Sequence, residues 1–207
     1  RWYPGAGIYR NTWLEINNDV HVPKWGTFIT NPSITENEAS VRVLTEIKNT
    51  ANKNKEVSLQ TIIYDPNNKE VANIRSRVQT KQNTTVEAIQ TTSVDSPMLW
   101  DLDTPNLYTA MTTILQGDTI LDTYKTTFGI RTIAYGSDFG FKLNDKNTRF
   151  KGVCLHHDLG PLGAAVNKRA TERQLQIMQE MGVNAIRTSH NPPSPEQVQL
   201  CDQMGLM

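Results

Sequence analysis

Polar residues that could recognise a hydroxyl-rich ligand lie in two short segments near the end of the chain. His156, His157 and Asp158 follow one apolar run, and His190 and Asn191 follow another. A neutral imidazole donates a hydrogen bond from one nitrogen and accepts one at the other, so paired histidines suit a ligand rich in hydroxyl groups. The alternative is that one histidine caps a loop and the other is simply exposed to solvent.

A metal site is a second chemistry that these residue types allow. Two or three histidines together with Asp158 could bind zinc. Successive residues of a strand point to opposite faces, however, so His156 and His157 cannot both face one ion while the strand stays regular. We therefore expect no metal site among these residues.

Alternating strand and helix patterns must position these side chains. Short apolar runs predict strands over 149–155 and 185–189. Apolar residues on one helical face predict a helix over 167–181, and a serine N-cap followed by proline predicts a second helix over 194–205. Strands that alternate with helices indicate a parallel sheet, and β/α barrels place their active sites at the carboxyl ends of such strands. The pattern therefore predicts the start of a β/α barrel with both histidine segments on one rim.

Arg187 has a more specific environment. Within the strand over 185–189, alternation places Ile186 under the helices and Arg187 on the opposite face, inside the barrel. A buried guanidinium needs a carboxylate, because an unpaired buried charge is costly. No acidic residue in 149–207 is an obvious partner, so we expect the partner to come from a later strand. The alternative is that Arg187 extends to the rim and contacts solvent or Asp158.

The region before these elements is rich in strand patterns. Val57, Leu59, Thr61 and Ile63 alternate with other residues in the period-two pattern of a half-buried strand. Similar segments, separated by turn signals, follow the same logic and cover 27–31, 41–49, 70–79, 84–92, 106–116 and 119–130. Such an array predicts an immunoglobulin-like sandwich. The Cys…Trp…Cys hallmark is absent, so we expect apolar packing alone to hold it.

Three segments follow from these patterns. Residues 1–24, with a strand-like run over 9–16, are predicted to be the tail of a preceding β domain. Residues 25–134 form the immunoglobulin-like β-sandwich, and residues 135–207 form the first βαβα units of a TIM barrel that is truncated. The predicted class is mainly β with an α/β C-terminal part. Because two βα units leave an unpaired parallel edge, we expect 135–207 to be poorly ordered or paired with a second copy.

Composition narrows the classes of function. Lysine plus arginine and aspartate plus glutamate number 21 each in 207 residues, so the net charge of zero disfavours nucleic acid and an anionic membrane as partners. The chain has no apolar run long enough for a transmembrane helix. It begins with Arg1 rather than methionine, so a leader sequence offers no guide to the compartment. Cys154 and Cys201 are far apart and are predicted to be buried free thiols.

Long motifs of the chain resemble a known family. GVCLHHDLGPLGAA, ERQLQIMQEMGVNAIRTSHNPP and LCDQMG together resemble the start of the catalytic barrel in family 2 glycoside hydrolases, the β-galactosidase group. PGAGIYRNTWL resembles the end of that family's sugar-binding jelly-roll domain. LWDLDTPNLYTAMTTIL and YKTTFGIRTI resemble the last strands of its immunoglobulin-like middle domain. The resemblance covers essentially the whole chain, in the family's domain order.

The resemblance implies retaining hydrolysis of a terminal β-galactoside, in which one carboxylate attacks the anomeric carbon and another protonates the leaving oxygen. Both are glutamates on later barrel strands in this family, so no catalytic acid is expected before Met207 and the fragment alone is expected to be inactive. The resemblance assigns His156 and His190 to hydrogen bonds with the bound sugar. It places Asn191 on the rim and Arg187 beside the nucleophile. The family's metal ligands also lie downstream, so no metal or cofactor is assigned to this chain.

The resemblance leaves alternatives open. β-Glucuronidases and β-mannosidases share the architecture, although the HHDLGPLGAA motif favours a galactosidase. A carbohydrate-binding or structural module with a degenerate barrel is the alternative from another class. The implied partner is a carbohydrate substrate, and the full-length enzyme is expected to be a homo-oligomer. The resemblance favours a periplasmic or secreted enzyme, and a cytoplasmic location also stays open.

Overall fold

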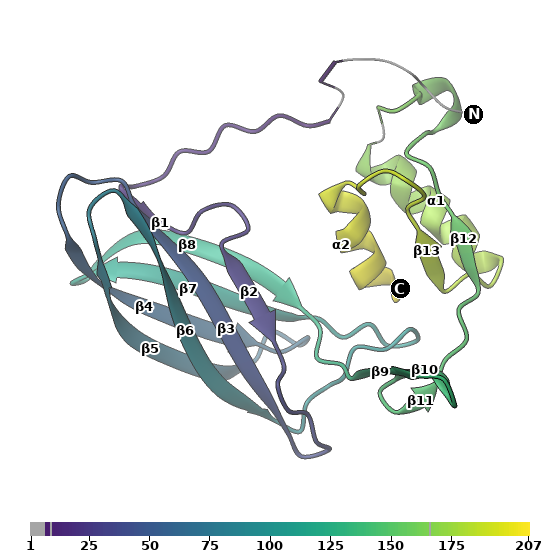
Figure 1. Ribbon diagram of the computed structural model, residues 1–207, viewed down its shortest axis with the longest axis horizontal. Coiled ribbons are helices and arrows are strands. Elements are labelled where there is room, and N and C mark those ends of the chain that lie inside the picture. The colour runs from purple at the N-terminus through teal and green to yellow at the C-terminus, as the bar shows by residue number, and fades with distance from the viewer. Residues whose placement is uncertain (1–6, 9, 166) are drawn as a thin grey trace. The chain divides into compact units, whose positions relative to one another are not determined.

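A computed structural model describes residues 7, 8, 10–165 and 167–207 (Figure 1). The chain divides into two compact units, and each is described by itself. The first, here called the sandwich unit, contains Glu15–Trp100 and Asn106–Thr132. The second, here called the βα unit, contains Arg1–Leu14, Asp101–Pro105 and Ile133–Met207.

The sandwich unit consists of two antiparallel four-stranded sheets, as Figure 1 shows. In the first sheet, β1, β2 and β6 all pair with β3; the strands are β1 (Val20–His21), β2 (Thr27–Thr30), β3 (Glu38–Asn49) and β6 (Thr84–Asp95). The second sheet has the order β5-β4-β7-β8, with β4 (Lys55–Tyr64), β5 (Glu70–Thr80), β7 (Tyr108–Gln116) and β8 (Thr119–Phe128). These sheets confirm the predicted immunoglobulin-like sandwich.

Alternating burial along the strands builds the interior of the sandwich. Val57, Leu59, Thr61 and Ile63 are all buried, which confirms the period-two prediction for β4. Buried apolar residues form two clusters. The first contains Ala39, Val41, Val43, Ile63, Val94, Tyr108, Ala110 and Ile130. The second contains Val20, Val22, Ile47, Val57, Leu59, Ala88 and Ile114. Burial of these side chains from water is the main favourable contribution to folding of this unit.

A buried polar cluster supplements this apolar packing. The Thr61 hydroxyl donates to Gln90 Oε1 at 2.7 Å, across the space between the two sheets. Gln90 Nε2 in turn donates to the Leu59 carbonyl at 3.1 Å and to Ser76 Oγ at 3.0 Å. Because buried polar groups destabilise a core unless they are hydrogen-bonded, these contacts fix how the sheets face each other. The expectation that apolar packing alone holds the sandwich is therefore wrong.

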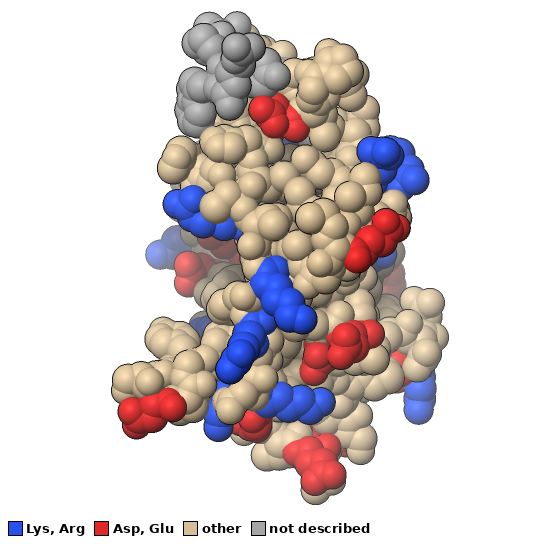
Figure 2. Space-filling view, turned by 90° about the vertical axis from the view of Figure 1, so that its right-hand side faces the viewer, with Lys and Arg blue, Asp and Glu red and all other residues tan. Residues whose placement is uncertain are grey.

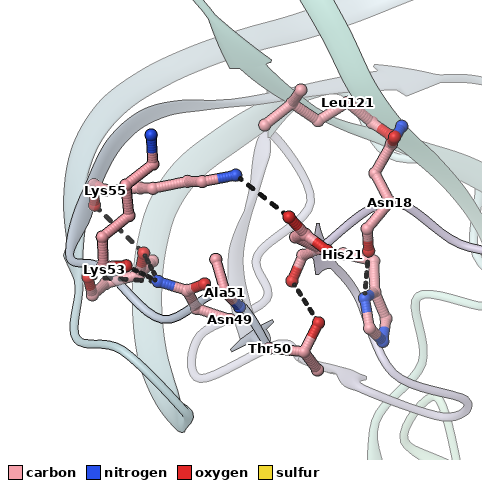
Figure 3. A network of polar contacts seen from close by, with 10 residues as sticks. Asn18, His21, Asn49, Thr50, Ala51, Lys53, Lys55 and Leu121 are labelled. Carbon is pink, nitrogen blue, oxygen red and sulfur yellow. Dashed lines mark hydrogen bonds and ion pairs between the residues drawn. The ribbon is translucent and has the colours of Figure 1, made fainter.

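Asn49 holds the end of β3 in place (Figure 3). Its side chain is buried, and its amide nitrogen donates to the Lys53 carbonyl at 3.0 Å and to Thr80 Oγ1 at 3.1 Å. Its amide oxygen accepts a hydrogen bond from the Ala51 backbone nitrogen at 2.9 Å. The same corner contains a half-buried histidine, His21, whose Nδ1 lies 2.8 Å from the Asn18 carbonyl. A fully satisfied buried amide of this kind is typical of a structural anchor rather than a reactive site.

The start of the sandwich differs from the sequence prediction. β1 lies before the predicted boundary at residue 24, and both Val20 and Val22 belong to the buried core. The strand expected over 9–16 is not formed among its described residues, 10–16, and Tyr9 lies outside the described part of the chain. Trp13 is 68% exposed and Leu14 88% exposed, because no neighbouring strand among the described residues pairs with this segment.

The βα unit begins with a small antiparallel sheet of β9 (Ile133–Gly136), β10 (Gly140–Leu143) and β11 (Lys146–Asn147). Two short strands then pair in parallel, β12 (Gly152–Cys154) and β13 (Ala185–Arg187). A 3-10 turn (Gly160–Leu162) and α1 (Lys168–Glu180) lie between them, and α2 (Pro195–Met204) follows (Figure 1). This order confirms the predicted βαβα start of a TIM barrel.

Local sequence explains where both helices begin and end. Asn167 caps α1 by accepting from the Ala170 backbone nitrogen, and Ser194 caps α2 by accepting from that of Gln197 at 3.2 Å. Gly205 ends α2 in the left-handed conformation, with φ of 71°. A Cβ at this position would collide with the backbone carbonyl of Leu102, so only glycine fits.

Charged side chains of both signs are interspersed on the face shown in Figure 2. This mixture agrees with the net charge of zero. Within the described residues, no helix combines the length and apolar character needed to cross a bilayer.

Candidate functional site

The parallel pair brings both histidine segments to one edge. Gly152 pairs with Ala185 and Cys154 with Arg187, and the Leu155 backbone nitrogen donates to the Arg187 carbonyl at 2.8 Å. Parallel strands in this register end together, so the residues that follow them share a rim. His156 lies two residues after the end of β12, and His190 lies three residues after the end of β13.

His156 and His190 lie next to each other on this rim. Their ring centroids are 6.1 Å apart, and the rings meet nearly edge to face at 79°. The arrangement can present imidazole donors and acceptors to one ligand, as the sequence predicts.

His157 has a different position. Its Nδ1 atom is buried, and its side chain lines a cavity of about 30 Å³ that is also lined by His156, Thr171 and Gln174. A cavity of this size holds about two water molecules and is too small for a sugar ring.

Asn191 lies in the loop 188–194 between β13 and α2. Its backbone nitrogen donates to the Thr188 carbonyl at 3.2 Å. Its side-chain oxygen Oδ1 is buried and has no hydrogen-bond partner within the described part of the chain. The preceding Ser189 has a φ of 51°, a left-handed conformation that is uncommon for a residue with a Cβ. A buried acceptor without a partner beside a strained residue is typical of a functional loop.

Ile186 and Arg187 face opposite sides of the sheet, as strand alternation predicts. Ile186 packs into an apolar cluster with Leu175 of α1 and Leu200 of α2. The Arg187 guanidinium is exposed on the other face, and its Nη1 lies 3.7 Å from Cys154 Sγ. Both helices cover the Ile186 face, and β12 and β13 form a two-stranded sheet among the described residues, so burial of this guanidinium inside a complete barrel stays a prediction.

Arg187 makes no ion pair with a carboxylate among residues 7, 8, 10–165 and 167–207, and the alternative partner Asp158 is not in contact with it. The guanidinium therefore faces the open side of the sheet with its five donors largely available to another group.

Both cysteines are free thiols in different environments. Cys154 is exposed, contrary to the prediction, because it lies on the same open face as Arg187. Cys201 packs at the apolar cluster of α1 and α2. Burial, and secondarily the charge of Asp202, raises the pKa of the Cys201 thiol to about 11.

Two residues that join distant parts of the βα unit were not identified from the sequence. Asn184 accepts from the Lys151 backbone nitrogen at 2.8 Å and donates to the Arg149 carbonyl at 2.9 Å, so it joins the starts of both strands. Arg10 donates to the carbonyls of Pro192 and Pro193 at 2.6 and 3.2 Å. No local sequence pattern indicates either set of contacts, because each joins residues far apart in sequence.

No group of three or more His, Cys, Asp or Glu side chains that could hold a metal ion occurs in the described part of the chain.

Comparison with known proteins identifies the family. The profile of glycosyl hydrolases family 2 matches residues 20–131, and the profile of the TIM barrel domain of glycosyl hydrolases family 2 matches residues 135–207. The chain is 46% identical to beta-galactosidase BoGH2A of Bacteroides ovatus and 36% identical to a putative beta-glucuronidase of Formosa agariphila. All of the chain is covered in both comparisons, but it spans only 24% and 19% of those proteins.

Solved structures agree with the sequence comparisons. A glycosyl hydrolase family 2 member from Bacteroides cellulosilyticus superimposes with a TM-score of 0.95 at 41% identity. The match covers 100% of this chain and 28% of that one. The chain belongs to family 2 of the glycosyl hydrolases.

Proposed function

We propose that this chain supplies the sugar-binding shell of a retaining β-glycosidase that hydrolyses terminal β-galactosides. His156, His190 and Asn191 hydrogen-bond the hydroxyl groups of the bound sugar, and Arg187 orients the nucleophilic carboxylate. The observation that carries this proposal is the edge-to-face pair of His156 and His190 at the common end of two parallel strands. The buried Oδ1 atom of Asn191 adds an acceptor that a sugar hydroxyl would satisfy.

The proposed roles divide binding from bond cleavage. Retaining hydrolysis uses two carboxyl groups about 5–5.5 Å apart, one as nucleophile and one as acid and then base. The exposed Arg187 guanidinium, which pairs with no carboxylate in the described residues, is suited to hold one of them. We therefore place both carboxylates on later barrel strands and expect residues 1–207 alone to bind sugar weakly and to cleave nothing.

We propose that residues 1–24 are the end of a sugar-binding domain, 25–134 a spacer sandwich and 135–207 the start of the catalytic barrel. The packing of Val20 and Val22 in the sandwich core favours moving the first boundary to just before residue 20.

A β-glucuronidase is the second candidate, because several relatives, including that of Formosa agariphila, carry this name. Glucuronides differ from galactosides in a carboxylate, which a glucuronidase must pair with a cation or with hydrogen-bond donors. The identity of 46% to a protein named beta-galactosidase favours the galactoside.

The test is hydrolysis by the full-length gene product, with p-nitrophenyl β-galactoside and p-nitrophenyl β-glucuronide assayed in parallel. His190→Ala should lower kcat/KM for the preferred substrate by roughly 100-fold, because it removes hydrogen bonds to the sugar. His21→Ala is the matched control, since His21 lies in the sandwich unit and contacts only Asn18 in Figure 3. It should stay within about twofold of wild type. A folded wild-type enzyme that cleaves no β-glycoside, or an unaffected His190→Ala variant, would contradict the proposal.

A further inference from the structure

The loop 188–194 has few hydrogen bonds of its own. Pro192 and Pro193 have no backbone N–H, and neither has Pro195 just beyond. The backbone hydrogen bond within the loop joins the Asn191 nitrogen to the Thr188 carbonyl at a long 3.2 Å. Ser189 adds a left-handed φ of 51°. A loop with this backbone needs contacts from elsewhere to stay in one conformation.

Arg10 supplies such a contact from the other end of the chain. Its Nη2 donates to the Pro192 carbonyl at 2.6 Å and its Nη1 to the Pro193 carbonyl at 3.2 Å, across 182 and 183 residues of sequence. Two consecutive carbonyl oxygens are thus held by the two arms of one guanidinium. The neighbouring Asn11 donates to Glu196 Oε1 at 3.3 Å, which ties the same segment to the first turn of α2.

The geometry suits arginine in particular. A guanidinium is planar and presents its donors in a rigid fork, whereas a lysine ammonium is a point donor on a flexible stem. Arg10 also lines the small cavity that His156, His157 and Ser194 line, so it lies directly behind the rim. All of these residues belong to the βα unit.

We propose that Arg10 is a positioning residue, which holds the loop 188–194 so that His190 and Asn191 keep their places on the rim. It acts through those residues and does not itself touch the sugar. Its effect on sugar binding rests on the function proposed above, whereas its effect on the loop does not.

Hydrogen–deuterium exchange of the full-length gene product tests the effect on the loop. Arg10→Ala should raise the exchange rates of the amides of Ser189, His190, Asn191 and Ser194 by about tenfold, while those of α1 stay unchanged. Arg10→Lys, which keeps the charge but loses the fork, should give an intermediate increase. Arg169→Ala is the matched control, because Arg169 is an exposed arginine of the same unit that contacts Glu172 and Gln176 on α1.

Steady-state kinetics test the consequence for binding. Arg10→Ala should lower kcat/KM for a p-nitrophenyl β-glycoside by about tenfold, mainly through a higher KM, and should weaken inhibition by the free sugar in proportion. Arg10→Lys should recover part of this loss, and Arg169→Ala should match wild type. Inactivity of the wild-type enzyme toward every β-glycoside would end the proposed function, and the exchange result would still decide the role of Arg10.

Unchanged exchange in 188–194 in both Arg10 variants would overturn the proposal. So would faster exchange throughout α1 and the sandwich strands, since Arg10 would then stabilise the whole fold rather than this loop. Arg10→Lys covers the case in which Arg10→Ala fails to fold.

Discussion

The sandwich unit and the parallel strand pair use polar residues in opposite ways. In the sandwich unit, Thr61, Gln90 and Asn49 are buried and hydrogen-bonded to neighbouring protein groups. On the rim after β12 and β13, His190 and Arg187 are exposed. Buried, satisfied polar groups fix one arrangement of a core. Exposed polar groups that lie together on one edge can instead contact a ligand.

The two units also differ in how much apolar side-chain packing they contain. In the sandwich, two clusters draw buried residues from both sheets. The cluster of the βα unit has four buried members, Leu155, Leu175, Leu200 and Leu206, and lies between the strands and both helices. The other face of β12 and β13 carries the exposed Cys154 and Arg187. Buried packing is therefore concentrated in the sandwich unit and the candidate chemistry in the βα unit.

The largest expected difference is in glycosidase activity between the full-length gene product and residues 1–207. The full-length gene product should hydrolyse p-nitrophenyl β-galactoside, whereas purified residues 1–207 should show no turnover above the buffer rate, because the two carboxylates of the reaction lie on later strands in our proposal. A chromogenic assay at equal molar concentration measures this. Turnover by the fragment that is lost in its His190→Ala variant would contradict the assignment.

Amide exchange should separate the two regions by on the order of a thousandfold. β3 lies between neighbouring strands and within the core, whereas β12 and β13 form a short two-stranded pair with unpaired outer edges among the described residues. Exchange of residues 1–207, measured by mass spectrometry on a verified monomer, should be slow in 38–49 and fast in 152–154 and 185–187. Equally slow exchange in both regions would contradict the expectation that β12 and β13 are less stable than β3.

Core substitutions measure how much apolar and polar side chains each contribute to the stability of the sandwich unit. Leu59 is completely buried, and Leu59→Ala should lower the free energy of unfolding of the sandwich unit by about 2–5 kcal/mol through lost contacts and a cavity. Gln90→Ala should cost about 1–3 kcal/mol, because it leaves the Thr61 hydroxyl and the Leu59 carbonyl with one buried partner fewer. Urea denaturation followed by Trp fluorescence measures both. A neutral Gln90→Ala would mean that the polar cluster does not hold the sheets.

The smallest expected difference is in the alkylation rates of the two thiols, Cys154 and Cys201. A pKa of about 11 leaves roughly one Cys201 thiol in a thousand ionised at pH 8, although the few thiolates are more nucleophilic. We expect alkylation of Cys201 by iodoacetamide to be roughly tenfold slower than that of an ordinary thiol. The exposed Cys154 should react first, as peptide mass spectrometry can show. The difference should shrink above pH 9, as Cys201 begins to ionise, and preferential labelling of Cys201 at pH 8 would contradict the packing described.

The sequence predicted much of the local structure correctly. The alternation of Val57, Leu59, Thr61 and Ile63 identified β4 and its inward face. The Ser194 cap and Gly205 identified both ends of α2. These features follow from nearest-neighbour chemistry and strand or helix periodicity, so they are written in a few adjacent residues.

Long-range contacts could not be predicted in the same way. The strand expected over 9–16 did not form among its described residues, because a strand requires a partner that periodicity does not reveal. Val20 and Val22 were assigned to the wrong side of a boundary, since their burial depends on other strands. The Thr61–Gln90 bond and the Arg10 contacts likewise join residues that no local pattern connects.

The order of residues along the chain was enough to show which polar residues follow each strand, and the two-residue period of a strand was enough to show which face of β13 carries Arg187. The 6.1 Å between the His156 and His190 rings and the hydrogen bonds from Arg10 to the Pro192 and Pro193 carbonyls came from the folded arrangement alone. The reason is physical: periodicity sets the direction of a side chain, whereas distance between side chains depends on how separate elements pack.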